Sequence, residues 1–261
     1  ITEHLRLGLP MGFQASIIAI GTLTVQVALN SLGTDAVAAY TTASRVDSLA
    51  VAFLASLGLA ASMYTAQNLG GRRPDRIRRG IRQALIMALI TAVVLGVLFV
   101  LFGSAIVRLF VGSGSDEVVR LASQMLMING ATYSLLAVLL VLRGVLQGLG
   151  HALIPTVTGV IELVMRVVAA VALGGLMGFV GVALSNPLAW IGAVAVLIPA
   201  YLAAHRALRQ MPVDPVEVTE TTAMAVIGPR EGSMVVDAIM TSTVPIVVMR
   251  KTKLARRVSS A

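Results

Sequence analysis

The chain has 261 residues, of which 57% are hydrophobic and 12% charged, and its mean hydropathy is +0.91. Soluble domains are about 45–50% apolar and about 25% charged, so this composition excludes an ordinary soluble protein. The net charge of +8 is compatible with nucleic-acid binding. However, eight of the twenty cationic residues flank long apolar runs, which is the placement expected in a membrane protein. Because the chain has no cysteine, disulfides and thiol chemistry are also excluded.

The orientation expected in the membrane comes from one arginine-rich segment. Between Leu69 and Gln83 the sequence holds six arginines, with long apolar runs on either side. Short basic loops stay on the cytoplasmic side during membrane insertion. We therefore predict that this segment and both chain termini face the cytoplasm, and that the loops at 32–35, 111–117 and 174–181 face outside.

Six segments are long and apolar enough to cross a bilayer as helices, which takes about 20 residues each. They predict an all-α membrane protein in which residues 1–208 form one lobe of six transmembrane helices. The breaks between them are the arginine-rich segment and turns that contain glycine. The predicted spans are 8–30, 36–68, 83–110, 118–149, 152–173 and 180–204.

The remaining residues, 209–261, have a different composition. They contain four of the nine prolines, and their most apolar stretch, 233–249, is shorter than a bilayer span. We predict a cytoplasmic tail that is disordered or loosely folded; the alternative is that its basic end, 250–257, contacts anionic lipid. Since residue 1 is an isoleucine and no secretory signal precedes the first span, we also expect the chain to be part of a longer protein.

Three charged residues lie deep within the predicted spans, namely Asp47, Glu162 and Arg166. A charged side chain at mid-membrane costs about 2.5–3.5 kcal/mol on insertion scales, so each requires a partner or a function. Glu162 and Arg166 have the i, i+4 spacing that allows neutralisation within one helix. Asp47 pairs poorly with Arg45, because residues at i and i+2 face apart, so its partner is expected on another helix, with Arg166 as a candidate.

The network of Asp47, Glu162, Arg166 and Arg45 has two interpretations that the sequence leaves open. One is structural neutralisation. The other is proton or cation coupling, because intramembrane acids form proton relays in transporters and a carboxylate that exchanges an arginine for a proton changes charge with conformation. Arg143, by contrast, is expected near the inner end of its helix, where its side chain would snorkel towards water.

The first predicted span carries a loose polar stripe, because its polar side chains recur at multiples of four residues on a helix with 3.6 residues per turn. The stripe consists of Gln14, Thr22, Gln26 and Asn30. These residues either line a substrate path or hydrogen-bond to neighbouring helices, and both interpretations stay open. On the fourth span, Gly144 and Gly148 form a small-residue pair that is typical of close helix packing.

Enzyme signatures are absent from the sequence. The three histidines, His4, His151 and His205, fall at expected helix ends and have no metal-binding or phosphate-loop context. We therefore expect no catalytic residue, no metal site and no cofactor.

Several sequence blocks resemble the MATE (multidrug and toxic compound extrusion) transporters. The blocks are GLPMGFQ at 8–14, NSLGTDAVAAY at 30–40, AQNLGG at 66–71, LRGVLQGLG at 142–150 and IELVMR at 161–166. In this order they resemble the second of the family's two six-helix lobes. The resemblance implies a six-helix N-terminal lobe as partner, and a twelve-helix transporter in the plasma membrane of a prokaryote that exports amphipathic, often cationic compounds by antiport with H⁺ or Na⁺.

The sequence departs from one branch of this family. The branch that resembles NorM carries acidic residues in helices seven and ten, whereas the matching stretches here, around Ile18 and Leu136, are apolar. The resemblance therefore implies that the principal coupling residue lies in the other lobe, with Asp47 and Glu162 in supporting roles.

The same resemblance makes Gln14 and Gln26 candidates for the wall of the substrate cavity. Two alternative functions remain at this point. One is a lipid-linked oligosaccharide flippase of the same superfamily, which a strongly basic cavity would favour. The other is a stand-alone membrane subunit with a structural or regulatory role.

Overall fold

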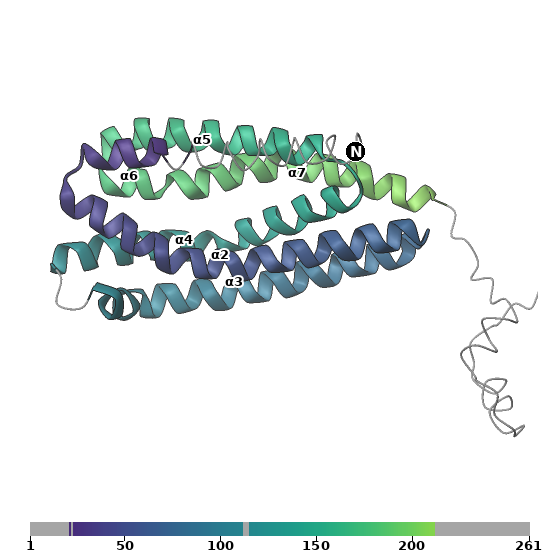
Figure 1. Ribbon diagram of the computed structural model, residues 1–261, viewed down its shortest axis with the longest axis horizontal. Coiled ribbons are helices and arrows are strands. Elements are labelled where there is room, and N and C mark those ends of the chain that lie inside the picture. Colours follow the sequence, from purple (N-terminus) through teal and green to yellow (C-terminus); the bar gives the residue numbers. More distant parts are fainter. Residues whose placement is uncertain (1–20, 22, 112–114, 212–261) are drawn as a thin grey trace, which may run out of the picture. The chain divides into compact units, whose positions relative to one another are not determined.

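The computed structural model describes residues 21, 23–111 and 115–211, and these residues are almost entirely helical (Figure 1). Residues 23–30 end a first helix, which is followed by a turn at 31–33. The helices after it are α2 (Thr34–Gly70), α3 (Pro74–Val111), α4 (Asp116–Gly148), α5 (Leu153–Met177), α6 (Phe179–Ala183) and α7 (Ser185–Gln210). Most of the first predicted span and nearly all of the predicted tail lie outside the described residues.

Five segments of the described chain are long and apolar enough to cross a membrane: α2, α3, α4, α5 and the combined stretch of α6 and α7. They match the last five of the six predicted spans, so the predicted all-α membrane fold is confirmed. In the described lobe, α2, α3 and α4 pack together in one layer, and α5 and α7 pack against each other in a second (Figure 1). α4 contacts both layers and is the most buried of these helices.

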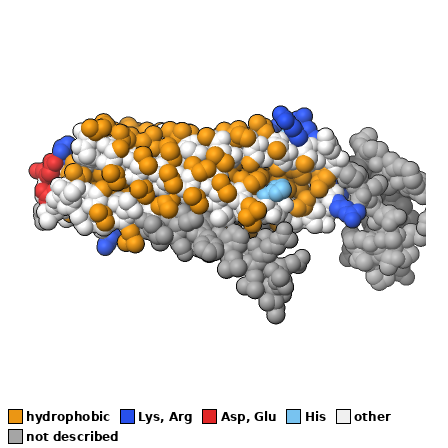
Figure 2. Space-filling model, turned by 90° about the horizontal axis from the view of Figure 1, so that it is seen from above, with side chains coloured by type: hydrophobic (Ala, Val, Ile, Leu, Met, Phe, Trp, Pro, Cys, Tyr) orange, Lys and Arg blue, Asp and Glu red, His pale blue; other side chains and the backbone are white. Residues whose placement is uncertain are grey.

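The surface of the described lobe is apolar along its length and charged at its ends. Figure 2 shows hydrophobic side chains spread over one face, with arginines at both ends and acidic groups at one end. Large aliphatic and aromatic side chains, such as Phe53, Ile90, Leu101 and Val171, are exposed on the helices. Exposing such a surface to hydrocarbon costs no free energy, whereas exposing it to water does.

Glycines bring the helix backbones into direct contact. A Cβ atom on Gly144 would overlap the carbonyl oxygen of Gly58 on α2, and one on Gly148 would overlap that of Ser62. The close packing predicted for the Gly144 and Gly148 pair is therefore confirmed. Such small residues matter in a bilayer because helix association there depends on van der Waals packing rather than on the hydrophobic effect.

The arginine-rich segment contains the turn between α2 and α3, as expected, but most of it is helical. α3 begins at Pro74, nine residues before the predicted start at 83, and the turn occupies only Gly71–Arg73. Proline suits the first helical position because it has no N–H to leave unpaired, and Asp75 in the first turn favours the positive end of the helix dipole. The helix begins earlier than the predicted span because hydropathy marks where the hydrocarbon ends, and this helix continues beyond it.

The break before the last span lies within the predicted loop 174–181 but is much shorter than that loop. α5 continues through Gly174 and Gly175 to Met177, and the chain turns at Gly178, where φ is +59°. Glycine adopts this left-handed conformation without the steric cost that a Cβ atom would add. The last span is then divided at Leu184 into the short α6 and the long α7, which ends six residues beyond the predicted end at 204.

Candidate functional site

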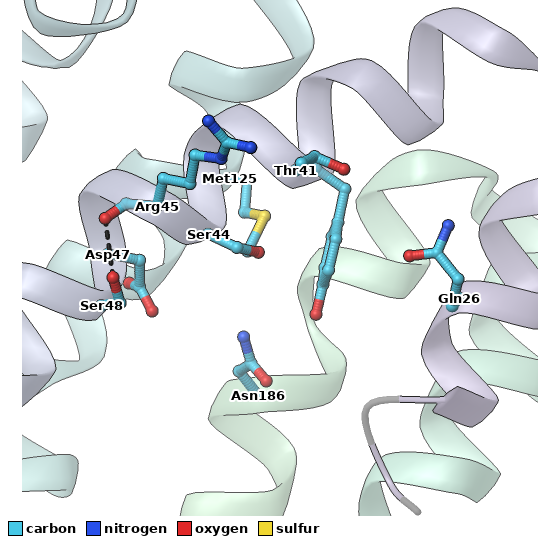
Figure 3. Close-up of a pocket in the computed structure, with 9 residues that line it drawn as sticks. Gln26, Thr41, Ser44, Arg45, Asp47, Ser48, Met125 and Asn186 are labelled. Carbon is cyan, nitrogen blue, oxygen red and sulfur yellow. Dashed lines mark hydrogen bonds between the residues drawn. The ribbon is translucent and has the colours of Figure 1, made fainter. Parts of the chain in front are cut away.

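An open pocket of about 450 Å³ lies where α2 meets the end of the first helix, α4 and α7 (Figure 3). Six of its nine lining residues come from α2, and the other helices contribute one residue each. The lining residues are Gln26, Tyr40, Thr41, Ser44, Arg45, Asp47, Ser48, Met125 and Asn186. The pocket thus combines polar groups with the apolar surface of a tyrosine and a methionine.

The spacing of polar residues on α2 explains why this helix supplies most of the pocket. Tyr40, Ser44 and Asp47 follow the i, i+4, i+7 pattern of a single helix face. The adjacent face of α2 packs into the core through small side chains such as Ala39 and Ala43. This helix is therefore amphipathic within the membrane, with a polar face that other helices leave open.

Asp47 lies in the pocket wall and is held by uncharged groups from α4. Its Oδ1 atom accepts a hydrogen bond of 2.6 Å from the hydroxyl of Tyr133 and one of 3.0 Å from the amide Nδ2 of Asn129. The Tyr133 ring is in turn fixed between Phe99 and Trp190, at centroid distances of 5.7 and 6.2 Å. Asp47 makes no ion pair with any residue that the structure describes.

These contacts correct the partner proposed for Asp47 from the sequence. Its partners do lie on another helix, but they are Asn129 and Tyr133 rather than Arg166. Arg166 instead pairs with Glu162 on its own helix, at 3.3 Å. Arg45 is exposed, and Figure 3 shows its guanidinium directed away from the Asp47 carboxylate, as residues at i and i+2 require.

A second cluster joins α4 to α5. Glu162 accepts a hydrogen bond of 2.7 Å from Arg143 and one of 3.3 Å from Arg166. The three side chains are only 10–13% exposed. The cluster therefore holds two guanidinium groups and one carboxylate in a largely buried position, with one positive charge in excess.

The position of Arg143 differs from the expectation that it snorkels towards water. Its side chain turns into the lobe, because the Glu162 carboxylate on α5 lies within ion-pair distance. Glu162 and Arg166 do form the i, i+4 pair that their spacing predicts. The structure thus divides the four residues of the predicted network into two clusters, with Asp47 and Arg45 at the pocket and Glu162 and Arg166 in the triad with Arg143.

The polar stripe of the first span is described only in part. Gln26 lines the pocket, and its side-chain amide donates a hydrogen bond of 3.4 Å to Asn30, which is exposed. Gln14 and Thr22 lie outside the described residues. Among the residues that the structure does describe, no group of three or more His, Cys, Asp or Glu side chains is placed to hold a metal ion.

The residues that the sequence did not single out are mostly uncharged. On the pocket wall they include Tyr40, Ser44 and Asn186, and beside it Asn129 and Tyr133. Two signals were present in the sequence. The polar residues of α2 that precede Asp47 share its helix face, and Asn129 and Tyr133 have the i, i+4 spacing that places both on one side of α4.

The family model for MatE matches residues 10–172 of the chain. The chain belongs to the MATE family. This confirms the resemblance seen in the sequence blocks, and with the apolar helices it makes the chain a multi-pass membrane protein. Relatives include the probable multidrug resistance protein YoeA of Bacillus subtilis, 30% identical over 156 residues, and the multidrug resistance protein MdtK of Proteus mirabilis, 34% identical over 147 residues.

Solved structures give the same fold for this MATE chain. A MOP superfamily transporter from Pyrococcus furiosus superposes with a TM-score of 0.73 at 21% identity, over 85% of this chain and 50% of that one. A MATE protein in the bent conformation superposes with a TM-score of 0.70 at 23% identity, over 82% and 48%. The alignments with YoeA and MdtK cover 60% and 54% of this chain but only 33% and 31% of the relatives. The chain therefore spans about a third of these relatives and half of the solved chains.

Proposed function

We propose that this chain is one lobe of a twelve-helix secondary transporter that exports drugs or other amphipathic, cationic compounds by antiport with H⁺ or Na⁺. Its partner would be the six-helix N-terminal lobe of the same transporter. The observation that carries the proposal is the open polar pocket in the membrane-spanning lobe, with the Asp47 carboxylate in its wall. The names of the relatives, which refer to multidrug resistance, and the extent of the match to half of the solved chains support it.

The lining of the pocket suits an organic cation. Tyr40 and Met125 offer apolar and aromatic surface, and Gln26, Ser44 and Asn186 offer hydrogen-bonding groups. The charges of Arg45 and Asp47 cancel formally, but the Arg45 guanidinium is exposed and directed away from Asp47, whereas Asp47 is partly buried (Figure 3). The field inside the pocket is therefore that of the carboxylate, and a single exposed arginine does not make the strongly basic cavity that a flippase of anionic lipid carriers would need.

Asp47 is the residue of this lobe that we assign to the exchange of cargo for a coupling cation, in support of the principal coupling residue expected in the other lobe. Hydrogen bonds from neutral groups do not cancel the charge of an ionised carboxylate, so either a cationic cargo or an inward-moving cation lowers its energy. The cargo and the coupling cation would bind the same carboxylate oxygen atoms, so they exclude one another. Mutual exclusion at a site that faces alternate sides of the membrane is the minimum that antiport requires.

The arginine-rich segment and both termini would face the cytoplasm of a prokaryote in this proposal. Because the chain has no cysteine, single cysteines can report the orientation. Gly70 is a suitable position because a Cβ atom there meets nothing within 4 Å, and Ser113 lies in the loop expected outside. A membrane-impermeant thiol reagent applied to intact cells should label Ser113→Cys and not Gly70→Cys; the reverse pattern would overturn the orientation.

The export function is tested in bacteria that lack their own drug exporters. The chain is expressed alone and together with the six-helix N-terminal lobe of a related transporter, and accumulation of a cationic dye is measured with and without an uncoupler. We expect export only with both lobes, its loss with the uncoupler, and its loss in Asp47→Asn. The matched control is Asp35→Asn, which removes an acid at the start of α2 outside the pocket.

Each remaining outcome has a definite meaning. Export that persists in Asp47→Asn and still responds to the uncoupler would overturn the role of Asp47. Absence of dye export when both lobes are present in the membrane would contradict multidrug transport by this pair. Export by the chain alone would show that two copies form the pore and that the N-terminal lobe is dispensable.

A further inference from the structure

The two ends of the described lobe differ in charge. Eight arginines lie at one end of the lobe, on the α2–α3 turn, the start of α3 and the end of α7. We call this end of the lobe the arginine-rich end. Its arginines are Arg72, Arg73, Arg76, Arg78, Arg79, Arg82, Arg206 and Arg209. Among the described residues of this end, Asp75 is the one acid, and it lies 3.6 Å from Arg73.

The other end of the lobe is neutralised. There Arg108 pairs with Asp116 at 3.1 Å and Arg120 pairs with Glu117 at 2.6 Å. Figure 2 shows acidic side chains at only one end of the face in view, and basic ones at both. The surplus of positive charge is therefore a local property of the arginine-rich end.

Arg78 lies on α3 and Arg209 lies on α7, and these two helices contact one another. One helical turn before Arg209, α7 also carries His205. Neither arginine has an ion pair with a described residue, and the buried Nε of Arg78 has no hydrogen-bond partner. His205 is held beside Tyr201, whose hydroxyl is 3.4 Å from its Nδ1 atom. The positive charges of arginines at one end of a lobe repel one another, and an anion bound among them would reduce this repulsion.

Both helices continue from these arginines into exposed aliphatic side chains on the same face. On α7, Leu202 precedes Arg206 and Arg209 by four and seven residues, and it is 47% exposed. On α3, Ile86 and Ile90 follow Arg82 by four and eight residues, and they are 49% and 60% exposed. A cationic group with an apolar stripe beneath it matches an amphiphile that has an anionic head and a hydrocarbon tail, and not a free anion.

We propose that the arginine-rich end binds an anionic phospholipid, with its phosphate between Arg78 and Arg209 and its acyl chains along the exposed stripes of α3 and α7. Guanidinium groups donate paired, charge-assisted hydrogen bonds to phosphate oxygens, which a zwitterionic lipid accepts less well because its ammonium group is repelled. The inference does not depend on transport, and it holds for whichever leaflet contains this end of the lobe.

The test measures binding of acyl-labelled phosphatidylglycerol to the full chain in a neutral detergent, by fluorescence polarisation. We expect phosphatidylglycerol to bind at least about tenfold more tightly than phosphatidylcholine, and Arg78→Gln/Arg209→Gln to reduce its affinity by about tenfold or more. The matched control, Arg108→Gln/Arg120→Gln, removes the same charge from the other end and should leave binding unchanged. Arg78→Lys/Arg209→Lys, which keeps the charge, should retain most of it.

Several results would overturn the proposal. They are equal binding of the two lipids, equal loss in the two glutamine pairs, and unchanged binding in Arg78→Gln/Arg209→Gln with a circular dichroism spectrum that confirms folding. Displacement of the lipid by inorganic phosphate at millimolar concentration would reassign the position to free phosphate.

Discussion

Asp47 and Glu162 are both carboxylates in the middle of apolar helices, but their surroundings are opposite. Glu162 contacts two guanidinium groups, at 2.7 and 3.3 Å, and does not line the pocket. Asp47 is held by a phenol and an amide, at 2.6 and 3.0 Å, and lies in the wall of a pocket of about 450 Å³. The comparison separates an acid that is ion-paired within the lobe from one that has no ion pair among the described residues.

The physical difference lies in what each set of partners does to the charge. An ion pair cancels the field of a carboxylate, whereas hydrogen bonds from neutral donors stabilise the charge and leave most of its field in place. Glu162 therefore stabilises the packing of α4 against α5, two helices that have few other contacts. Asp47 keeps a negative potential that a ligand in the pocket experiences.

The largest expected effect is that of Glu162→Gln. It leaves Arg143 and Arg166 as two buried like charges with no carboxylate between them, which should cost about 3–5 kcal/mol of unfolding free energy. The measurement is unfolding by SDS in mixed micelles, followed by circular dichroism. Glu117→Gln, which removes an exposed acid from an ion pair at the lobe surface, is the control and should cost at most about 1 kcal/mol. Equal losses in the two variants would contradict the distinction drawn for Glu162.

Removing either arginine of the triad should cost less, because a neutral ion pair remains. Arg143→Gln loses the shorter contact and the one that joins α4 to α5, so we expect a loss of about 1–3 kcal/mol. Arg166→Gln loses a contact of 3.3 Å within α5 and should cost about half as much. The same SDS titration ranks them. A larger loss for Arg166→Gln would mean that the pair within α5, and not the link between helices, maintains the cluster.

Tyr133→Phe tests the neutral partners of Asp47. The substitution removes the hydrogen bond of 2.6 Å but keeps the ring that packs between Phe99 and Trp190, so we expect a loss of about 1–2 kcal/mol. Tyr201→Phe is the matched control, because its hydroxyl makes only a contact of 3.4 Å with His205. If both variants lose the same amount, the hydrogen bond to Asp47 contributes nothing beyond an ordinary tyrosine hydroxyl.

The helices were predictable from the sequence because a bilayer span has a fixed minimum length. The breaks near Gly178 and at the turn after Gly70 were found because glycine marks them. The start of α3 was missed, since arginines end the apolar run without ending the helix. Hydropathy locates the boundary of the hydrocarbon, and helix boundaries depend on local backbone groups such as Pro74.

The membership of the two buried clusters was only partly predictable. The pair of Glu162 and Arg166 follows from spacing within one helix, but the addition of Arg143 depends on how far α4 is shifted along α5. Asn129 and Tyr133 carry no charge, and they therefore lack the high cost of membrane insertion by which the charged residues were identified. There was no such reason in the sequence to choose them as partners of Asp47. Contacts between helices are set by packing, for instance of Gly144 against Gly58, and a single sequence does not specify that register.

Asp47→Asn should have the smallest effect on stability of these substitutions, below about 1 kcal/mol. The amide oxygen of asparagine accepts the same hydrogen bonds from Tyr133 and Asn129, and no arginine loses an ion pair. Its effect on binding should be large, because the field of the carboxylate disappears from the pocket. Affinity for a fluorescent lipophilic cation, measured by polarisation on the full chain in detergent, should fall at least about tenfold, which corresponds to about 1.4 kcal/mol.

The same variant should bind an uncharged analogue of that dye as well as the unsubstituted chain does, because the shape of the pocket is kept. Loss of both ligands would indicate that the pocket had collapsed, and retention of the cation would place its binding elsewhere in the lobe. Glu162→Gln provides the opposite pattern, with a large loss of stability and an unchanged cation affinity for the fraction that remains folded. The opposite result would be a loss of stability in Asp47→Asn and a loss of cation affinity in Glu162→Gln. It would mean that a nearby counter-charge does not determine which of the two acids binds a ligand, and that depth in the membrane predicts this better.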